Sequence, residues 1–189
     1  MGPFDNYKAL AAILYLSNAL VRDAELLRLV KLMYLADRRY LNLRGTTITN
    51  DFFMFIDDRN VVGAMTYDML GEAAGMRTEH RWLKRFVKDY LRVENGALDS
   101  LRRVIPVRQP DLDELSPLSL QVLDAILSDY LGKDFEDVMN ESEEKLRQLV
   151  GARGQLVTYE QMTEDAGALA YLRWQRDVVP PPADERFHE

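Results

Sequence analysis

Histidine and carboxylate side chains are the residues of this sequence with the potential for acid–base chemistry or metal binding. The 189 residues contain two histidines, His80 and His188, and no cysteine. We therefore expect neither a histidine or thiolate metal site nor a cysteine nucleophile. His80 is the one candidate general base, but no nucleophile or orienting carboxylate stands at a recognisable spacing from it. We interpret His80 as a surface or packing residue and predict neither a catalytic site nor a cofactor.

Two adjacent carboxylates, Asp57 and Asp58, raise the alternative of a metal or acid–base site. Adjacent side chains seldom converge on one ion, whereas Asp and Asn are typical of turns. We therefore interpret Asp57, Asp58 and Arg59 as a solvated turn that is available to a partner. A small enzyme with a carboxylate-based site is the alternative, and it predicts that Asp57→Ala or Asp58→Ala abolishes activity.

Motifs of the common enzyme classes are absent from the sequence. There is no Walker phosphate loop, no GxGxxG, no GxSxG and no HExxH. We therefore do not predict an enzyme.

Aromatic and basic residues alternate in the stretch RWLKRFVKDY. Trp82, Phe86 and Tyr90 recur every four residues, with Arg81 and Arg85 among the bases between them. Such a mixture can stack on and neutralise nucleic acid, so a nucleic-acid-binding regulator that uses residues 77–108 is one alternative. The simpler interpretation is a helix whose aromatic stripe packs in the core. We favour the packed stripe, keep Arg81, Trp82 and Arg85 as candidate contacts of a protein partner, and do not expect nucleic acid.

Charge is divided along the chain, although the net charge is −7. Residues 77–108 contain 9 basic and 4 acidic residues, whereas residues 109–189 contain 7 basic and 18 acidic residues. The acidic third would repel a polyanion unless the two surfaces face apart. We interpret the basic stretch as a solvated, partly self-paired face, with an oppositely charged protein partner as the alternative.

Asp37 is the carboxylate whose position most needs an explanation. On a helix with 3.6 residues per turn, Asp37 falls in the middle of the apolar face of residues 24–44. The bases of this segment fall on the opposite, outer arc: Arg28, Lys31, Arg38 and Arg39. A buried carboxylate needs a base or a set of backbone N–H groups. We expect that partner from the turn at residues 57–62 or from Tyr67, and we predict that Asp37 is structural.

Helices are the main elements that must position these residues. Apolar periodicity predicts helices over residues 6–21, 24–44, 61–75, 116–132 and 158–178, and one or two short acidic helices over residues 133–154. Asp5, Asp23 and Ser116 are the predicted N-terminal caps, and Gly45 is expected just past the end of the second helix. The third helix, over residues 61–75, is expected to close at Gly71 or Gly75.

The predicted β structure is small. Residues 46–58 form a strand or a short helix, and Asn95-Gly96 predicts a tight hairpin turn in which Val93 faces Leu98 and Arg92 faces Asp99. The predicted fold is mainly α with a small β hairpin (α+β), in a single compact helical domain over residues 1–178. Residues 179–189 are predicted to be a Pro-rich, mobile tail.

The expected location is the cytoplasm. The N-terminal residues MGPFDNYK do not resemble a leader, and no segment has the roughly 18 uninterrupted apolar residues that span a bilayer. The absence of cysteine fits a reducing compartment. We therefore do not expect a membrane among the partners.

The stretch KLMYLADRRYLNLRGTTITND resembles the signature of the Panacea domain of SocA-like antitoxins. The residues that match this pattern are Lys31, Leu32, Tyr34, Ala36, Asp37, Gly45, Ile48 and Thr49. The later stretch LSPLSLQVLDAILSDYLGKDF is similar to a second family block that centres on a Leu-Asp pair, here Leu123 and Asp124. Residues 57–62 depart from the family, which usually has a Gly-Pro-Val turn there.

The resemblance implies a bacterial or phage-encoded antitoxin that neutralises a cognate toxin by direct protein–protein binding. Some relatives are similar to adaptors that deliver the toxin to a protease. A mainly helical fold with a small β element is also implied. The family-motif residues are Lys31, Tyr34, Asp37, Gly45 and Thr49. The candidate partner contacts are Asp57, Asp58, Arg59, Tyr67, Arg81, Trp82 and Arg85.

Overall fold

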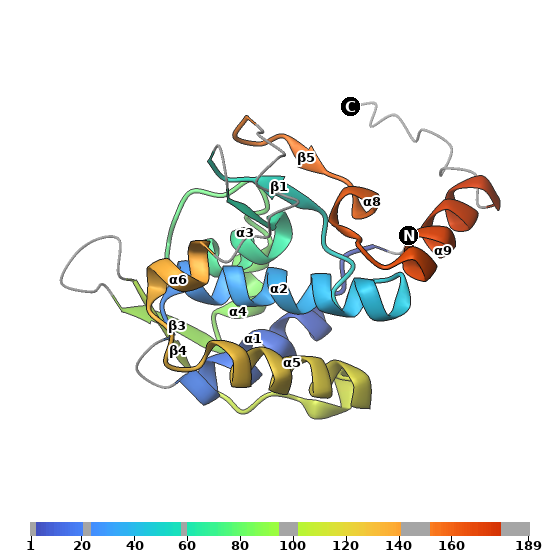
Figure 1. The fold of residues 1–189 in the computed structure, drawn as a ribbon. Helices are drawn as coiled ribbons and strands as arrows, with labels where there is room; N and C mark the ends of the chain where they lie inside the picture. The colour runs from blue at the N-terminus through green and yellow to red at the C-terminus, as the bar shows by residue number, and fades with distance from the viewer. Residues whose placement is uncertain (1–2, 21–23, 58–59, 95–101, 141–151, 179–189) are drawn as a thin grey trace.

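A long central helix, α2 (Leu26–Arg44), packs against more of the other described elements than any other helix does. The computed structural model describes residues 3–20, 24–57, 60–94, 102–140 and 152–178. Helices α1 (Asn6–Leu20) and α5 (Pro117–Tyr130) pack on one side of α2, and a small sheet lies on the other side (Figure 1). Helices α6 (Phe135–Asn140) and α9 (Ala166–Val178) also contact α2. The predicted fold class, mainly α with a small β part in one compact domain, is confirmed.

Helix α2 is buried over most of its circumference, which corrects the prediction for two of its bases. Arg28 and Lys31 were expected on an outer arc but are buried, and helices α5 and α6 pack against α2. An Nη2 hydrogen of Arg28 donates to the carbonyl of Tyr130 at 3.0 Å, and another donates to the carbonyl of Lys133 at 2.8 Å. Arg28 therefore caps the carbonyl end of α5, where a cation is favoured.

Two of the predicted N-terminal caps are present. The Lys8 N–H donates to Asp5 Oδ1 at 3.1 Å at the start of α1. The Ser119 N–H donates to Ser116 Oγ at 3.0 Å at the start of α5, which has a proline at its first position. These local signals can be read from sequence because a cap and its N–H lie within one turn.

The structure confirms the predicted C-terminal end of α2 but not its predicted N-terminal cap. The residue before its first turn is Glu25, so Asp23, which lies outside the described residues, is not the cap next to the helix. Gly45 ends the helix as predicted, with a positive φ of 70° and its N–H donating to the Leu41 carbonyl at 2.8 Å. A left-handed residue of this kind closes the last turn.

Residues 53–55 form the central strand of a small sheet. Within the described residues, β1 (Phe53–Phe55) lies between β2 (Val61–Gly63) and β5 (Leu156–Val157), and both pairings are antiparallel. Residues 61–63 were predicted to start a helix, and this is wrong because they pair with β1. Helix α3 (Ala64–Ala73) follows directly, and Gly71 lies inside it while Gly75 lies just beyond its end.

The predicted hairpin is present with another register. Strands β3 (Leu91–Glu94) and β4 (Arg103–Pro106) are antiparallel, but Val93 pairs with Val104 and Arg92 with Ile105. The predicted pairs with Leu98 and Asp99 are therefore wrong. Glu94 pairs with Arg103, so the connection is much longer than a two-residue turn. Asn95, Gly96 and the residues up to 101 lie outside the described part of the chain.

The C-terminal segment contains two helices where one was predicted. Helix α8 (Tyr159–Met162) has a capping box between Thr158 and Gln161, and it stops before α9. The Asp165 carboxylate accepts the Ala168 N–H at 2.8 Å, so Asp165 starts a new helix at this point. The short 3-10 helix η1 (Leu112–Glu114) precedes α5. The predicted continuation of the acidic helices over residues 141–151 and the tail over residues 179–189 lie outside the described residues.

Among the helices that the structure describes, none combines the length and apolar character needed to cross a membrane.

Gly45 provides a test of this packing. The Gly45→Ala change is expected to lower the free energy of unfolding by roughly 2 kcal/mol, because φ is positive and the new Cβ would overlap the Tyr171 ring. The control is Gly132→Ala, where φ is 87° but nothing lies within 4 Å of the new Cβ. Urea unfolding of both variants measures the difference. Equal losses would mean that the contact between Gly45 and Tyr171 does not stabilise the fold.

Candidate partner-binding groove

The Asp37 carboxylate is buried and binds the segment that follows α2. Its Oδ1 accepts the N–H groups of Ile48 at 2.8 Å and Thr49 at 3.1 Å, and its Oδ2 accepts the Thr49 hydroxyl at 2.6 Å. The expectation that backbone N–H groups satisfy Asp37 is confirmed. The expected location of those groups, at residues 57–62 or Tyr67, is wrong because the donors lie nearer in sequence.

The other motif residues also lie in the interior. The Lys31 Nζ is 4.9 Å from the centroid of the Tyr34 ring, and both side chains are buried. The Tyr34 ring packs edge-on against Phe53 of β1, with 5.7 Å between the ring centroids. The motif therefore attaches α2 to the sheet, and it forms no surface site.

Asp51 extends the buried network to α3. Its carboxylate accepts the N–H groups of Met65 and Thr66, each at 2.9 Å, so it caps α3 from outside the helix. Gly63 is required beside it, because a Cβ at that position would overlap the Asp51 carboxylate. The Asp51 N–H donates to Thr49 Oγ1 at 3.2 Å, which joins this cap to the Asp37 cluster. The buried network is defined here as Asp37, Thr49 and Asp51.

Burial changes the acidity of this network. Burial raises the pKa of Asp37 to about 7, although the hydrogen bonds from Thr49 and Ile48 lower it and the charge of Asp51 adds to the rise. Burial likewise raises the pKa of Asp51 to about 6, against the hydrogen bonds from Thr66 and Met65. The Tyr159 hydroxyl donates to the Asp51 carbonyl at 2.6 Å, and burial raises the pKa of Tyr159 well above its usual value.

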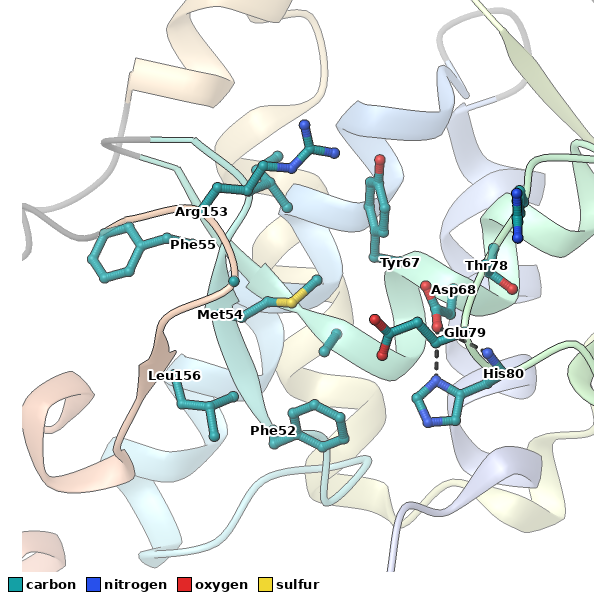
Figure 2. A pocket seen from close by; sticks show the side chains of 14 residues that line it. Phe52, Met54, Phe55, Tyr67, Asp68, Thr78, Glu79, His80, Arg153 and Leu156 are labelled. Atoms are coloured by element: carbon teal, nitrogen blue, oxygen red, sulfur yellow. Dashed lines mark hydrogen bonds and ion pairs between the residues drawn. The ribbon is translucent and has the colours of Figure 1, made fainter.

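A groove of about 640 Å³ lies over the face of the sheet that is turned away from α2. Its walls come from β1, β5, the first turns of α3 and residues 77–80 (Figure 2). The buried network positions two of these walls, because β1 begins just after Asp51 and the same carboxylate caps α3. We call this site the β1–α3 groove.

One wall of the groove is apolar. Side chains alternate along β1, so Phe53 and Phe55 are buried on the inner face, while Phe52 and Met54 point into the groove (Figure 2). Leu156 of β5 pairs with Met54 and lines the same wall. Phe52 is 43% exposed and Leu156 is 60% exposed. The sheet is therefore apolar on its open face as well as on its core face.

The opposite wall is polar. The His80 Nδ1 lies 2.7 Å from Asp68 Oδ2, and the His80 backbone N–H donates to the same oxygen at 3.3 Å. Glu79 lies beside this pair (Figure 2). Asp68 is thus the orienting carboxylate that the sequence did not identify, because it lies on a different element, twelve residues before His80.

The possible chemistry of the groove depends on the groups that line it. Its lining residues in the described part of the chain include no serine, and the Thr78 hydroxyl already donates to Glu72 Oε1 at 2.5 Å. Among the described residues, no three His, Asp or Glu side chains converge as metal ligands. What the arrangement offers is an apolar surface facing an oriented imidazole and carboxylates.

One of the predicted partner contacts lines the groove. The Tyr67 side chain, from the first turn of α3, stands at one end of it, near Arg153 (Figure 2). Asp57 lies just beyond β1 and is exposed, and its carboxylate accepts the Asn60 N–H at 2.7 Å. This confirms a turn at Asp57. Asp58 and Arg59 lie outside the described residues.

The other predicted contacts lie beside the groove, on or next to α4 (Leu83–Val87). Arg81, Trp82 and Arg85 are exposed and do not line the groove. The predicted aromatic core stripe is therefore wrong for Trp82. The buried residues of this short helix are Leu83 and Val87 instead.

Comparison with known proteins gave no match to a protein-family model, to a curated protein or to a solved structure.

The first test of the buried network is its stability. The Asp37→Ala change removes the acceptor of three buried donors, so it is expected to lower the free energy of unfolding by roughly 3 kcal/mol. The control is Arg39→Ala, which breaks an ion pair with Asp129 that is largely exposed and should cost less than about 1 kcal/mol. Arg38 is not a suitable control, because its Nε donates to the Met162 carbonyl at 3.1 Å. Equal melting temperatures for Asp37→Ala and Arg39→Ala would contradict a structural role.

The second test is the dependence of stability on pH. A raised pKa means that folded Asp37 keeps a proton that the unfolded chain has released, so its contribution to stability falls as pH rises from about 4 to about 7. The Asp37→Asn change keeps an amide oxygen that can still accept the Ile48 and Thr49 N–H groups, but the new side chain does not titrate in this pH range. Urea unfolding from pH 4 to 8 should therefore show a smaller fall with pH than in the wild type. Asp113→Asn, at an exposed position, is the control and should keep the full fall.

Proposed function

We propose that this protein is an antitoxin that neutralises a cognate toxin protein by direct binding, and that the toxin contacts the β1–α3 groove. The observation that carries the proposal is the exposed apolar wall, in which Phe52 and Leu156 face solvent beside an oriented polar wall. The proposal is also supported by the sequence resemblance to SocA-like antitoxins over Lys31, Tyr34 and Asp37.

The apolar wall can supply much of the binding energy. Full burial of a Phe or Leu side chain contributes about 1.5–3 kcal/mol relative to an exposed one. Aromatic anchors near the centre of an interface commonly carry most of its affinity. Phe52 is the expected anchor, with Leu156 and Met54 completing the surface that excludes water.

The polar wall can supply specificity. The Asp68–His80 pair and Glu79 present hydrogen-bonding groups on one side of the groove, and Tyr67 stands at its end. A partner that fills the apolar wall but leaves these groups unpaired would incur a desolvation penalty. The groove therefore suits a toxin surface that carries both an apolar side chain and polar groups opposite it.

Binding of the toxin at the groove would neutralise it by occlusion. A bound antitoxin covers the active site of the toxin or holds the toxin in an inactive conformation. Delivery of the bound toxin to a protease, in the cytoplasm, is the accessory role that the resemblance supports. The family-motif residues act indirectly in this proposal, because their network positions the groove from below.

Co-expression tests the function itself. The reading frame adjacent to this gene is expressed alone and together with this chain, and growth is measured. The neighbour should arrest growth alone and lose its toxicity on co-expression. A harmless neighbour, or toxicity that co-expression leaves intact, would contradict the antitoxin proposal.

A second set of variants tests the groove. Phe52→Ser and Leu156→Ser should abolish rescue of growth, while the melting temperature changes little because both side chains are exposed. The matched controls are Leu112→Ser and Leu43→Ser, which lie outside the groove and are 47% and 58% exposed. Rescue that survives in the groove variants, or that fails equally in the controls, would contradict toxin binding in the groove.

A further inference from the structure

Trp82 is a large apolar side chain that the fold leaves in solvent. It is 51% exposed at the start of α4. An exposed indole keeps a large apolar ring and an N–H group that a partner can contact. The side chains around Trp82 indicate which kind of partner could cover it.

Four cations occupy one face of the same helical segment. The backbone stays helical from Trp82 to Lys88, and hydrogen bonds join the Lys84 N–H to the Arg81 carbonyl and the Arg85 N–H to the Trp82 carbonyl. The spacing of three, four and seven residues places the cations on one arc, away from the buried Leu83 and Val87. The residues of this cationic ridge are Arg81, Lys84, Arg85 and Lys88.

These cations are exposed, and none of them has an ion pair with an acid in the described part of the chain. The sequence interpretation of a solvated face is confirmed for the ridge, and no self-pairing of these cations is found among the described residues. Two turns of helix spread the four charges over about 10 Å. Like charges held this close repel one another, so an anionic partner would relieve a cost that the free protein carries.

An aromatic flank borders the ridge. Phe86 lies one turn after Trp82 on the same side of the helix and is half-buried. Its ring packs edge-on against the exposed Tyr7 of α1, with 4.9 Å between the centroids. The surface therefore combines a row of cations with flat aromatic rings that are open to solvent.

We propose that the cationic ridge and Trp82 bind single-stranded nucleic acid, with phosphates on the ridge and an unpaired base stacked on the Trp82 indole. Cations that follow the backbone beside aromatic rings that stack on bases are the two parts of a sequence-tolerant single-strand site. This function is separate from toxin binding and does not depend on it.

The exposed indole favours this partner over the other anions. An acidic peptide would pair with the cations but has no flat ring to cover Trp82, and a duplex keeps its bases stacked inside. The net charge of −7 opposes any polyanion at long range. Screening limits this repulsion to about 10 Å at ordinary ionic strength, so a local cationic site can still bind.

The binding experiment uses the full chain and a labelled oligothymidylate of about 15 nucleotides. Fluorescence anisotropy at low salt should show binding, with log K falling against log salt with a slope of about −3 for four released counterions. An unlabelled duplex and an oligoglutamate peptide should compete weakly. No binding at low salt would overturn the proposal, as would equal competition by the duplex or by the peptide.

Two matched pairs of variants locate the site. Trp82→Ala should weaken oligothymidylate binding at least about tenfold, whereas Trp174→Ala, at a side chain that is 56% exposed on α9, should have no effect. The double change Lys84→Glu with Arg85→Glu should abolish binding. The double change Arg44→Glu with Arg173→Glu alters the net charge equally at exposed positions elsewhere and should leave most of the affinity.

Stacking has a signature of its own. In a Trp174→Phe background the remaining tryptophan is Trp82. Its fluorescence should be quenched by oligothymidylate and left unchanged by oligoglutamate. Binding without quenching, or binding that Trp82→Ala leaves intact, would overturn the assignment of Trp82 as the stacking residue.

Discussion

The hydrogen bonds from Ile48 and Thr49 to the buried Asp37 carboxylate are the interaction on which the arrangement of the other elements depends. A carboxylate in this position is unfavourable unless donors surround it, and the donors are the backbone of the segment just after α2. The segment must therefore fold back against the helix. Thr49 then receives the Asp51 N–H, and Asp51 caps α3, so three polar residues determine the path of the chain from α2 to α3.

The buried network of Asp37, Thr49 and Asp51 therefore also determines the shape of the β1–α3 groove. Phe52 follows Asp51 directly, and Tyr67 and Asp68 lie in the helix that Asp51 caps. A displacement of the cluster would move the apolar wall and the polar wall relative to each other. The motif that resembles an antitoxin family is thus interior, while the surface available to a partner is formed by residues outside that motif.

The parts of the fold that were predictable are those with local causes. The caps at Asp5 and Ser116 and the end of α2 at Gly45 each involve atoms within one helical turn, so their residue types are sufficient evidence. The burial of Arg28 was not predictable, because its partners are carbonyls about a hundred residues later in the chain. The predicted register of the hairpin was wrong for a related reason. A tight-turn motif does not determine which residues pair when the connection between the strands is long.

The groove was predictable only in part. Tyr67 was identified, but Asp68 and Leu156 were not, because the groove depends on β5 pairing with β1 about a hundred residues earlier. One local signal was present in the run FFMFI, which is apolar at every position. A strand with one solvent-exposed face should alternate between apolar and polar residues. An unbroken apolar run therefore indicates that both faces are buried, or that the exposed face is available to a binding partner.

The groove and the cationic ridge meet where residues 77–80 lead into α4. His80 lines the groove and donates its N–H to Asp68, while the next residue, Arg81, begins the ridge. A partner in the groove would therefore contact a segment that is covalently continuous with the ridge, and a nucleic acid on the ridge would border the groove. The two proposed surfaces therefore adjoin at this short segment. Part of the charge division along the sequence has a structural counterpart, because Lys84 and Arg85 on α4 and the flanking Arg81 and Lys88 form the ridge next to the groove.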